Sequence, residues 1–172
     1  MNIETIMSFM AQYGFMAIFV LVLLEYMNLP VLPGTVLLPV AGIITAKGGL
    51  NFPIALVVSV IAGLIGTCVI YILARLGGNA FLDWFKKNLP KKEEKLERIM
   101  EKLRVKGLAY AFVAKLIPTV RTLIAIPAGI LRLNFAGYAI YSTAGIFVWN
   151  IVLMMAGFLL GEQALVMLGV ER

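Results

Sequence analysis

The chain has 172 residues, of which 62% are hydrophobic and 14% are charged, and its formal net charge is +6. A soluble domain of this size has no need of so much apolar surface, so the composition predicts a membrane protein built as one domain, residues 1–172. Histidine is absent and Cys68 is the single cysteine. This excludes a disulfide framework, a cysteine-rich metal site and the commonest general base. We therefore expect neither an enzyme nor a bound cofactor or metal.

The positive charge is unevenly distributed along the chain. Ten of the fifteen Lys and Arg residues lie between Arg75 and Lys106, and none precedes Lys47. Basic residues concentrate in cytoplasmic loops, so we expect residues 79–106 in the cytoplasm and both termini outside. Membrane topology explains the charge better than a nucleic-acid site does. The first 15 residues lack the basic start and cleavage motif of a secretory signal, so no cleaved leader is expected.

The first apolar region, residues 14–46, is too interrupted to be a simple span. It contains four helix breakers, Pro30, Pro33, Gly34 and Pro39. Proline removes a backbone donor, and the freed carbonyls must find partners inside protein or in a wet cavity. Helical arms of about 10 to 15 residues, at about 1.5 Å per residue, cross only part of a core roughly 30 Å thick. The pattern predicts a re-entrant hairpin.

Two later segments have the length and composition of transmembrane helices. Residues 54–74 and 136–160 are free of charged side chains, and about 20 such residues cross the hydrocarbon core. Between them, residues 79–106 carry apolar side chains at helical spacing among many charged ones, which is typical of interfacial and amphipathic helices.

A second interrupted region covers residues 108–133. Pro118 and Pro127 break it, and its cations include Lys115 and Arg121. Its length and its breaks predict a second re-entrant hairpin, with Gly129 among the residues that shape it.

The two halves of the chain resemble each other. PVLPGTVLLPVAG at 30–42 parallels PTVRTLIAIPAG at 118–129, and LNF occurs at both 50–52 and 133–135. One full span, 54–74, separates the equivalent points, so the second copy is expected to be inverted. An inverted repeat brings interrupted segments together near the membrane midplane around a substrate site. We therefore predict an all-α polytopic membrane protein with two facing re-entrant hairpins.

Glu25 is the one acidic residue between Glu4 and Asp83. An ionisable group inside a membrane is costly unless it is paired or hydrated, so function is the first hypothesis. Glu25 then faces the cavity between the hairpins and titrates, or pairs with Arg121 or Lys115. The alternative is a residue at the hairpin base that reaches water.

Arg121 and Lys115 suggest a site for an anion. A guanidinium grips phosphate with two parallel hydrogen bonds, whereas an ammonium acts as a point charge. Together with N–H groups beside a helix break, the two cations could cradle a phosphate headgroup. Structural pairing of both cations with Glu25 and hairpin carbonyls is an equal alternative, and the two hypotheses are compatible.

Three motifs in the right order resemble those of DedA proteins, the bacterial members of the VTT or SNARE-associated group. The first is E-x4-P-x2-P-G followed by A-G, carried by Glu25, Pro30, Pro33, Gly34, Ala41 and Gly42. The second is similar to G-D-x3-Y-x2-G-R-x2-G and is matched by Gly66, Tyr71, Arg75 and Gly78. The third is similar to F-x2-R-x2-P-x2-R followed by A-G and is matched by Phe112, Pro118, Arg121, Ala128 and Gly129.

The resemblance implies a multi-pass protein of the bacterial inner membrane that moves phosphate-bearing lipids between leaflets. Undecaprenyl phosphate and phosphatidylethanolamine are the implied substrates. Membrane lipids are then the partners, with protons or monovalent cations as coupling ions and no nucleic acid, and a homo-oligomer is left open. The alternative functions are an ion- or proton-coupled transporter of a small solute or cation and a scaffold without transport.

The chain departs from the family pattern at four positions. Thr35 stands where many members have an acid after P-G, and we include it among the substrate-binding candidates with Arg121, Lys115 and Glu25. Thr67 replaces the Asp of the second motif, Ala74 replaces a Gly, and Lys115 replaces the first Arg of the third. With two family acids absent, Glu25 alone would have to serve in proton coupling.

Overall fold

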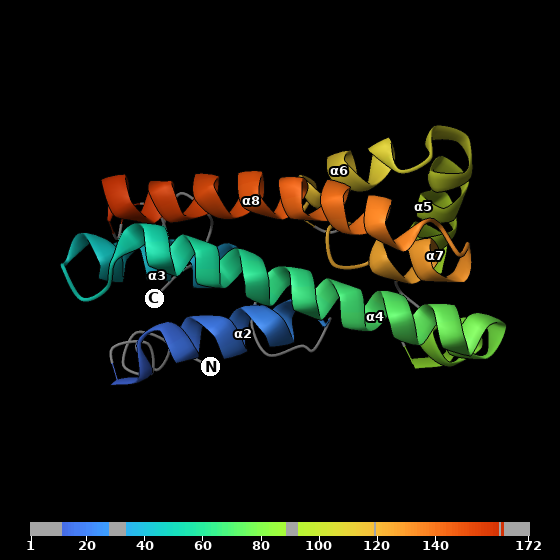
Figure 1. Ribbon diagram of the computed structural model, residues 1–172, viewed down its shortest axis with the longest axis horizontal. Coiled ribbons are helices and arrows are strands. Elements are labelled where there is room, and N and C mark those ends of the chain that lie inside the picture. The colour runs from blue at the N-terminus through green and yellow to red at the C-terminus, as the bar shows by residue number, and fades with distance from the viewer. Residues whose placement is uncertain (1–11, 28–33, 89–92, 119, 162, 164–172) are drawn as a thin grey trace. The chain divides into compact units, whose positions relative to one another are not determined.

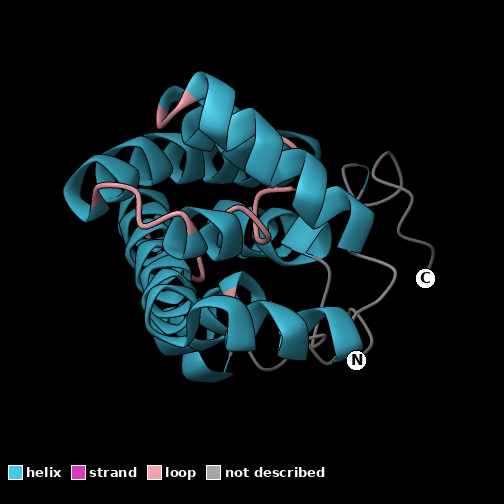
Figure 2. Ribbon diagram, turned by 90° about the vertical axis from the view of Figure 1, so that its right-hand side faces the viewer, coloured by secondary structure: helices cyan, strands magenta, loops and turns pink. Residues whose placement is uncertain are grey.

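The computed structural model describes residues 12–27, 34–88, 93–118, 120–161 and 163. Within these ranges the regular structure is helical throughout and contains no strand (Figure 2). The described helices are α2 (Phe15–Tyr26), α3 (Gly34–Ala46), α4 (Phe52–Asn88), α5 (Glu93–Lys106), α6 (Ala109–Lys115), α7 (Ala125–Ile130) and α8 (Phe135–Leu160) (Figure 1). The all-α fold class is confirmed.

Two of these helices are long and apolar enough to cross a membrane. They are Phe52–Gly78, with 27 residues, and Phe135–Leu160, with 26 residues. Each contains one of the two predicted spans and extends it slightly. α4 continues past Gly78, where the backbone leaves helical geometry at φ 51° and ψ −129°. The apolar span therefore ends at a turn that glycine adopts easily.

The chain forms two compact units. We call Met1–Gly63 with Phe147–Arg172 the first unit, and Leu64–Ile146 the second unit. Helices α4 and α8 each contribute residues to both units. The other described helices belong to one unit only.

In the first unit, α2 and α3 pack against each other, and glycines bring α3 close to the C-terminal part of α8. A side chain at Gly42 would overlap the carbonyl oxygen of Met154, and one at Gly157 would overlap that of Pro39. Small residues of this kind let membrane helices approach backbone to backbone. The Ala41–Gly42 step of the first motif therefore has a packing role.

Pro39 does not break its helix, contrary to the sequence analysis. It lies inside α3, which runs from Gly34 to Ala46. Its missing N–H leaves the carbonyl of Thr35, one turn earlier, without its helical donor. Pro30 and Pro33 lie outside the described residues, so their predicted part in the hairpin stays a prediction.

In the second unit, α5 packs on α6 and α7. It buries Leu96, Ile99 and Leu103, three of the apolar residues that the helical spacing of this segment predicted to lie on one face. The amphipathic helix is thus confirmed. The side chains of residues 81–95 lie outside the described part of the structure.

The helix break predicted at Pro118 is observed, whereas the prediction of a break at Pro127 is wrong. α6 ends at Lys115, and turns lead from there to α7, which begins at Ala125. Pro127 is the third residue of α7. A missing N–H costs little in the first turn of a helix, because that donor has no partner within the helix.

Candidate functional site

Lys115 joins three elements of the second unit. Its side chain is 0% exposed, and its Nζ donates to Thr67 Oγ1 on α4 at 2.6 Å and to the carbonyl oxygen of Arg121 at 2.9 Å. Gly145 of α8 leaves room for the lysine stem, because a Cβ there would lie 2.5 Å from the Cβ of Lys115. Both hydrogen bonds are charge-assisted, which makes them stronger than neutral ones.

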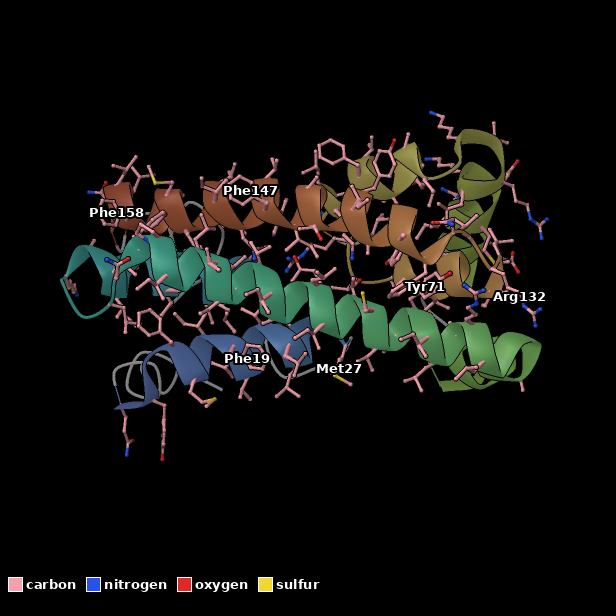
Figure 3. The ribbon with its side chains drawn as sticks, in the orientation of Figure 1. Phe19, Met27, Tyr71, Arg132, Phe147 and Phe158 are labelled. Atoms are coloured by element: carbon pink, nitrogen blue, oxygen red, sulfur yellow. The ribbon has the colours of Figure 1, made fainter. Side chains whose placement is uncertain are left out.

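Thr67 links Lys115 to a group of aromatic side chains. Its hydroxyl lies 3.3 Å from the Tyr138 hydroxyl, and the Tyr138 ring stacks on Tyr71 with centroids 4.9 Å apart. Tyr71, labelled in Figure 3, also contacts the ring of Phe135 at 5.4 Å. Since Thr67 accepts from Lys115, its own proton can go to Tyr138. The ammonium is therefore held by a polar group that buried rings fix in place.

Arg121 lies in the turns between α6 and α7, and its side chain is 3% exposed. Its backbone is fixed on both sides: the N–H donates to the Ile117 carbonyl at 2.9 Å, and the carbonyl accepts from Lys115. A buried cation is costly unless its surroundings compensate it. The backbone that carries the guanidinium is thus fixed, and anion binding by the guanidinium stays a prediction.

Gly129 sets the contact between α7 and α4. A side chain at this position would overlap the carbonyl oxygen of Tyr71 and lie 2.9 Å from the Cβ of Ala74. Only glycine fits, and the replacement of a family Gly by Ala74 occurs at this same contact. Pro118, by contrast, is exposed at the start of the turns.

Glu25 lies in the last turn of α2, in the first unit, and is 6% exposed. Its neighbour Tyr26 donates to Asn150 Oδ1 at 3.4 Å, and Asn150 Nδ2 donates to Ser59 Oγ at 3.0 Å. These bonds tie α2, α4 and α8 together through Tyr26, the residue after Glu25. Thr35, the fourth candidate, is half-buried in the first turn of α3.

The structure brings some of the candidates together. Lys115 and Arg121 are in contact, although Pro118 between them removes any regular helical relation. Glu25 belongs to the first unit and the two cations belong to the second, so the pairing predicted between them stays a prediction.

Two of the departures from the family pattern are also in contact. Thr67 stands in place of an acid and Lys115 in place of an arginine, and the two side chains form the 2.6 Å hydrogen bond. The sequence showed each change but did not show that they face each other. Tyr138 was missed altogether, because one tyrosine in a span that also contains Tyr141, Ser142 and Asn150 gives no distinct signal.

The described helices make an all-α protein, and two of them are long and apolar enough to cross a membrane. The family model of the VTT domain matches residues 32–159. Undecaprenyl phosphate transporter A of Staphylococcus aureus is 31% identical over 164 residues, which cover 93% of this chain and 80% of that protein. The protein of the same name from Bacillus subtilis is 30% identical over 161 residues, covering 94% of this chain and 79% of its own length.

A third relative, the uncharacterized membrane protein YbfM of Bacillus subtilis, is 27% identical over 158 residues, which cover 92% of this chain and 97% of that protein. No solved structure gives a significant match. The chain belongs to the VTT-domain family, whose bacterial members are the DedA proteins. Its assignment as a membrane protein, with bacterial relatives, follows.

Proposed function

We propose that this protein moves a phosphate-headed lipid, such as undecaprenyl phosphate or phosphatidylethanolamine, between the leaflets of the bacterial inner membrane. The observation that carries the proposal is the fixed, buried Arg121 beside Lys115 at a helix break. The names of two relatives as undecaprenyl phosphate transporters support the lipid-carrier class.

Arg121 is the proposed headgroup contact. A guanidinium remains charged and forms two parallel bonds to phosphate, which an ammonium cannot. Lys115 supports it by holding the carbonyl of the same residue at 2.9 Å, and direct contact of Lys115 with the headgroup stays a prediction.

The path across the membrane is proposed to run between two re-entrant hairpins, residues 14–46 and 108–133. The short helices support this. α2 has 12 residues and α3 has 13, so at about 1.5 Å per residue each is roughly 20 Å long, less than the roughly 30 Å core. Contact between α2 and α3 is what a chain that turns back requires. In this topology residues 79–106 are cytoplasmic and both termini are outside.

Glu25 and Thr35 complete the proposed site from the first hairpin. The buried carboxyl group of Glu25 is the candidate for coupling to protons or monovalent cations. The same buried acid supports the second candidate function, an ion- or proton-coupled transporter of a small solute or cation, because such a transporter also needs a titratable group inside the membrane.

Reconstitution in phosphatidylcholine liposomes tests the proposal. Undecaprenyl phosphate, or labelled phosphatidylethanolamine, is added, and its accessibility from outside is followed with and without an ion gradient. We expect lipid movement with the intact protein and little with Arg121→Gln of unchanged thermal stability. Solute flux without lipid movement would favour the second function. Neither activity in folded protein would leave the scaffold hypothesis.

A further inference from the structure

Two arginines of the second unit stand at the ends of the two membrane-length helices. Arg75 precedes Gly78, where the first span ends, and Arg132 precedes Phe135, where α8 begins. Tyr71 links Arg75 to the residue that follows Arg132: its hydroxyl donates to the carbonyl of Leu133 and accepts a hydrogen bond from Arg75 Nη1 at 3.0 Å. Figure 3 shows Tyr71 and Arg132 in the same part of this unit. The two arginines therefore share one end of the two spans.

The guanidinium of Arg75 is positioned by one hydrogen bond and keeps other N–H donors for a ligand. Arg75 is exposed, and the Tyr71 hydroxyl takes one of its five N–H donors. Tyr71 is itself fully buried and stacked on Tyr138, so it is a rigid support. Much of the entropy that an arginine loses on binding a ligand has already been lost here.

Arg132 occupies a position that normally belongs to glycine. Its φ is 51°, and it is the one non-glycine residue with positive φ among those that the structure describes. The N–H of Arg132 donates to Gly129 and that of Leu133 to Ala128, which is the Schellman ending of α7. Side chains other than glycine are strained there, and strain of this kind is a mark of functional positions. The Arg132 side chain is exposed.

We propose that Arg75 and Arg132 form a binding site for the phosphate of an anionic lipid at the membrane interface. Basic residues at the end of a span also follow from topology alone, but topology requires neither the Tyr71 bridge nor arginine in a left-handed conformation. Two guanidinium groups supply the forked donors that phosphate prefers.

The apolar surroundings favour a lipid over a free anion. Leu76, next to Arg75, is 81% exposed, and Phe135 and Ile140 on α8 are also exposed. A lipid bound by its phosphate lays its acyl chains along such side chains, whereas a soluble anion would leave them uncovered. The site goes beyond the proposed function, because binding here requires no movement between leaflets.

Lipid binding to the purified full-length protein tests the site. The protein is held in an uncharged detergent and titrated with phosphatidylglycerol or phosphatidylcholine, and bound lipid is counted by native mass spectrometry. We expect preference for phosphatidylglycerol. Loss of a charge-assisted hydrogen bond should weaken its binding at least about tenfold in Arg75→Gln and in Arg132→Gln.

Arg104→Gln is the matched control, because Arg104 is also exposed, on α5, and the change removes the same charge. An equal loss in this variant would show general attraction and overturn the site. Arg132→Gly keeps the left-handed backbone, so folding is safe; wild-type affinity in that variant would also overturn it. If inorganic phosphate displaced phosphatidylglycerol and bound the site as tightly as the lipid does, the lipid assignment would be overturned. Binding that persists in a protein without lipid movement would leave this site standing while the proposed function fails.

Discussion

The two interrupted apolar regions are alike in sequence and are held together differently. In the first, α2 and α3 have 12 and 13 residues and contact each other. In the second, α6 and α7 have 7 and 6 residues, with turns at 116–118 and 120–124 between them. Helical hydrogen bonds satisfy most of the described backbone of the first region. The second depends on a side chain, because Lys115 bonds the carbonyl of Arg121 across the break.

The difference shows that a charge beside a helix break can have two tasks at once. Lys115 satisfies backbone that the missing helix leaves open, and it also contributes positive charge to the candidate site. The first region differs, since the one carbonyl that Pro39 leaves without a helical donor lies inside α3, and the functional role of its acid, Glu25, stays a prediction. We therefore expect substitutions of charged residues to affect stability more in the second region than in the first.

Lys115→Met should have the largest effect on stability. The change removes the side-chain donor of the Arg121 carbonyl and leaves Tyr138 as the partner of the Thr67 hydroxyl. A buried group that loses its partner costs about 1–3 kcal/mol. Thermal unfolding in detergent measures the loss. Tyr26→Phe is the comparison in the first region and should cost less than about 1 kcal/mol, because its bond to Asn150 is long, at 3.4 Å. Equal losses would contradict the difference between the regions.

Arg121→Lys should reduce lipid movement by at least about tenfold while thermal stability changes little. The charge remains but the forked geometry is lost, and a charge-assisted bond is worth about 1.5–3 kcal/mol. The rate of leaflet exchange in liposomes is the measurement. A folded variant with near-normal lipid movement would end the headgroup role of Arg121.

A double-mutant cycle tests whether the two regions act on each other through Glu25 and Arg121. If they are a pair, Glu25→Gln or Arg121→Gln alone strands a charge, and the double variant should be more stable than either by about 1–3 kcal/mol. If the losses of stability in the two single variants add up in the double variant, Glu25 and Arg121 do not interact. Glu25→Gln should also abolish any pH dependence of transport if Glu25 is the coupling group.

Arg132→Gly should have the smallest effect on stability and, unlike the other changes, should increase it. Glycine removes the strain of the left-handed residue after α7, so stability should rise by about 1 kcal/mol. The unfolding temperature in detergent is the measurement, with Arg104→Gln as the neutral comparison. A lower unfolding temperature would mean that the Arg132 side chain stabilises the fold.

The helices of the molecule were readable from residue patterns, because a span needs about 20 uncharged residues and an amphipathic helix needs apolar spacing. Proline was a weaker guide. The effect of a proline depends on its place in a helix. Pro118 lies at a break, whereas Pro127 lies in the first turn of α7 and does not interrupt that helix. The residues Lys115 and Arg121 could be singled out by charge alone.

The contacts of Lys115 could not be predicted in the same way. Thr67 lies on a different helix from Lys115, and only the packing of α4, α6 and α8 brings the two together. A threonine in an apolar span can occur for many reasons unrelated to function. The role of its hydroxyl therefore cannot be predicted until its hydrogen-bond partner is known. Three-dimensional structure supplies what composition and periodicity lack at such a position.

The bond between Lys115 and Thr67 also constrains how this chain can vary among its descendants. An apolar residue at 67 would deprive a buried ammonium of one of its acceptors, and an apolar residue at 115 would remove the lysine that donates to a hydroxyl and a carbonyl. Either single step passes through a less stable protein, whereas a joint change to another donor and acceptor does not. Positions 67 and 115 should therefore change together, and chains that carry a lysine at 115 should keep an acceptor at 67.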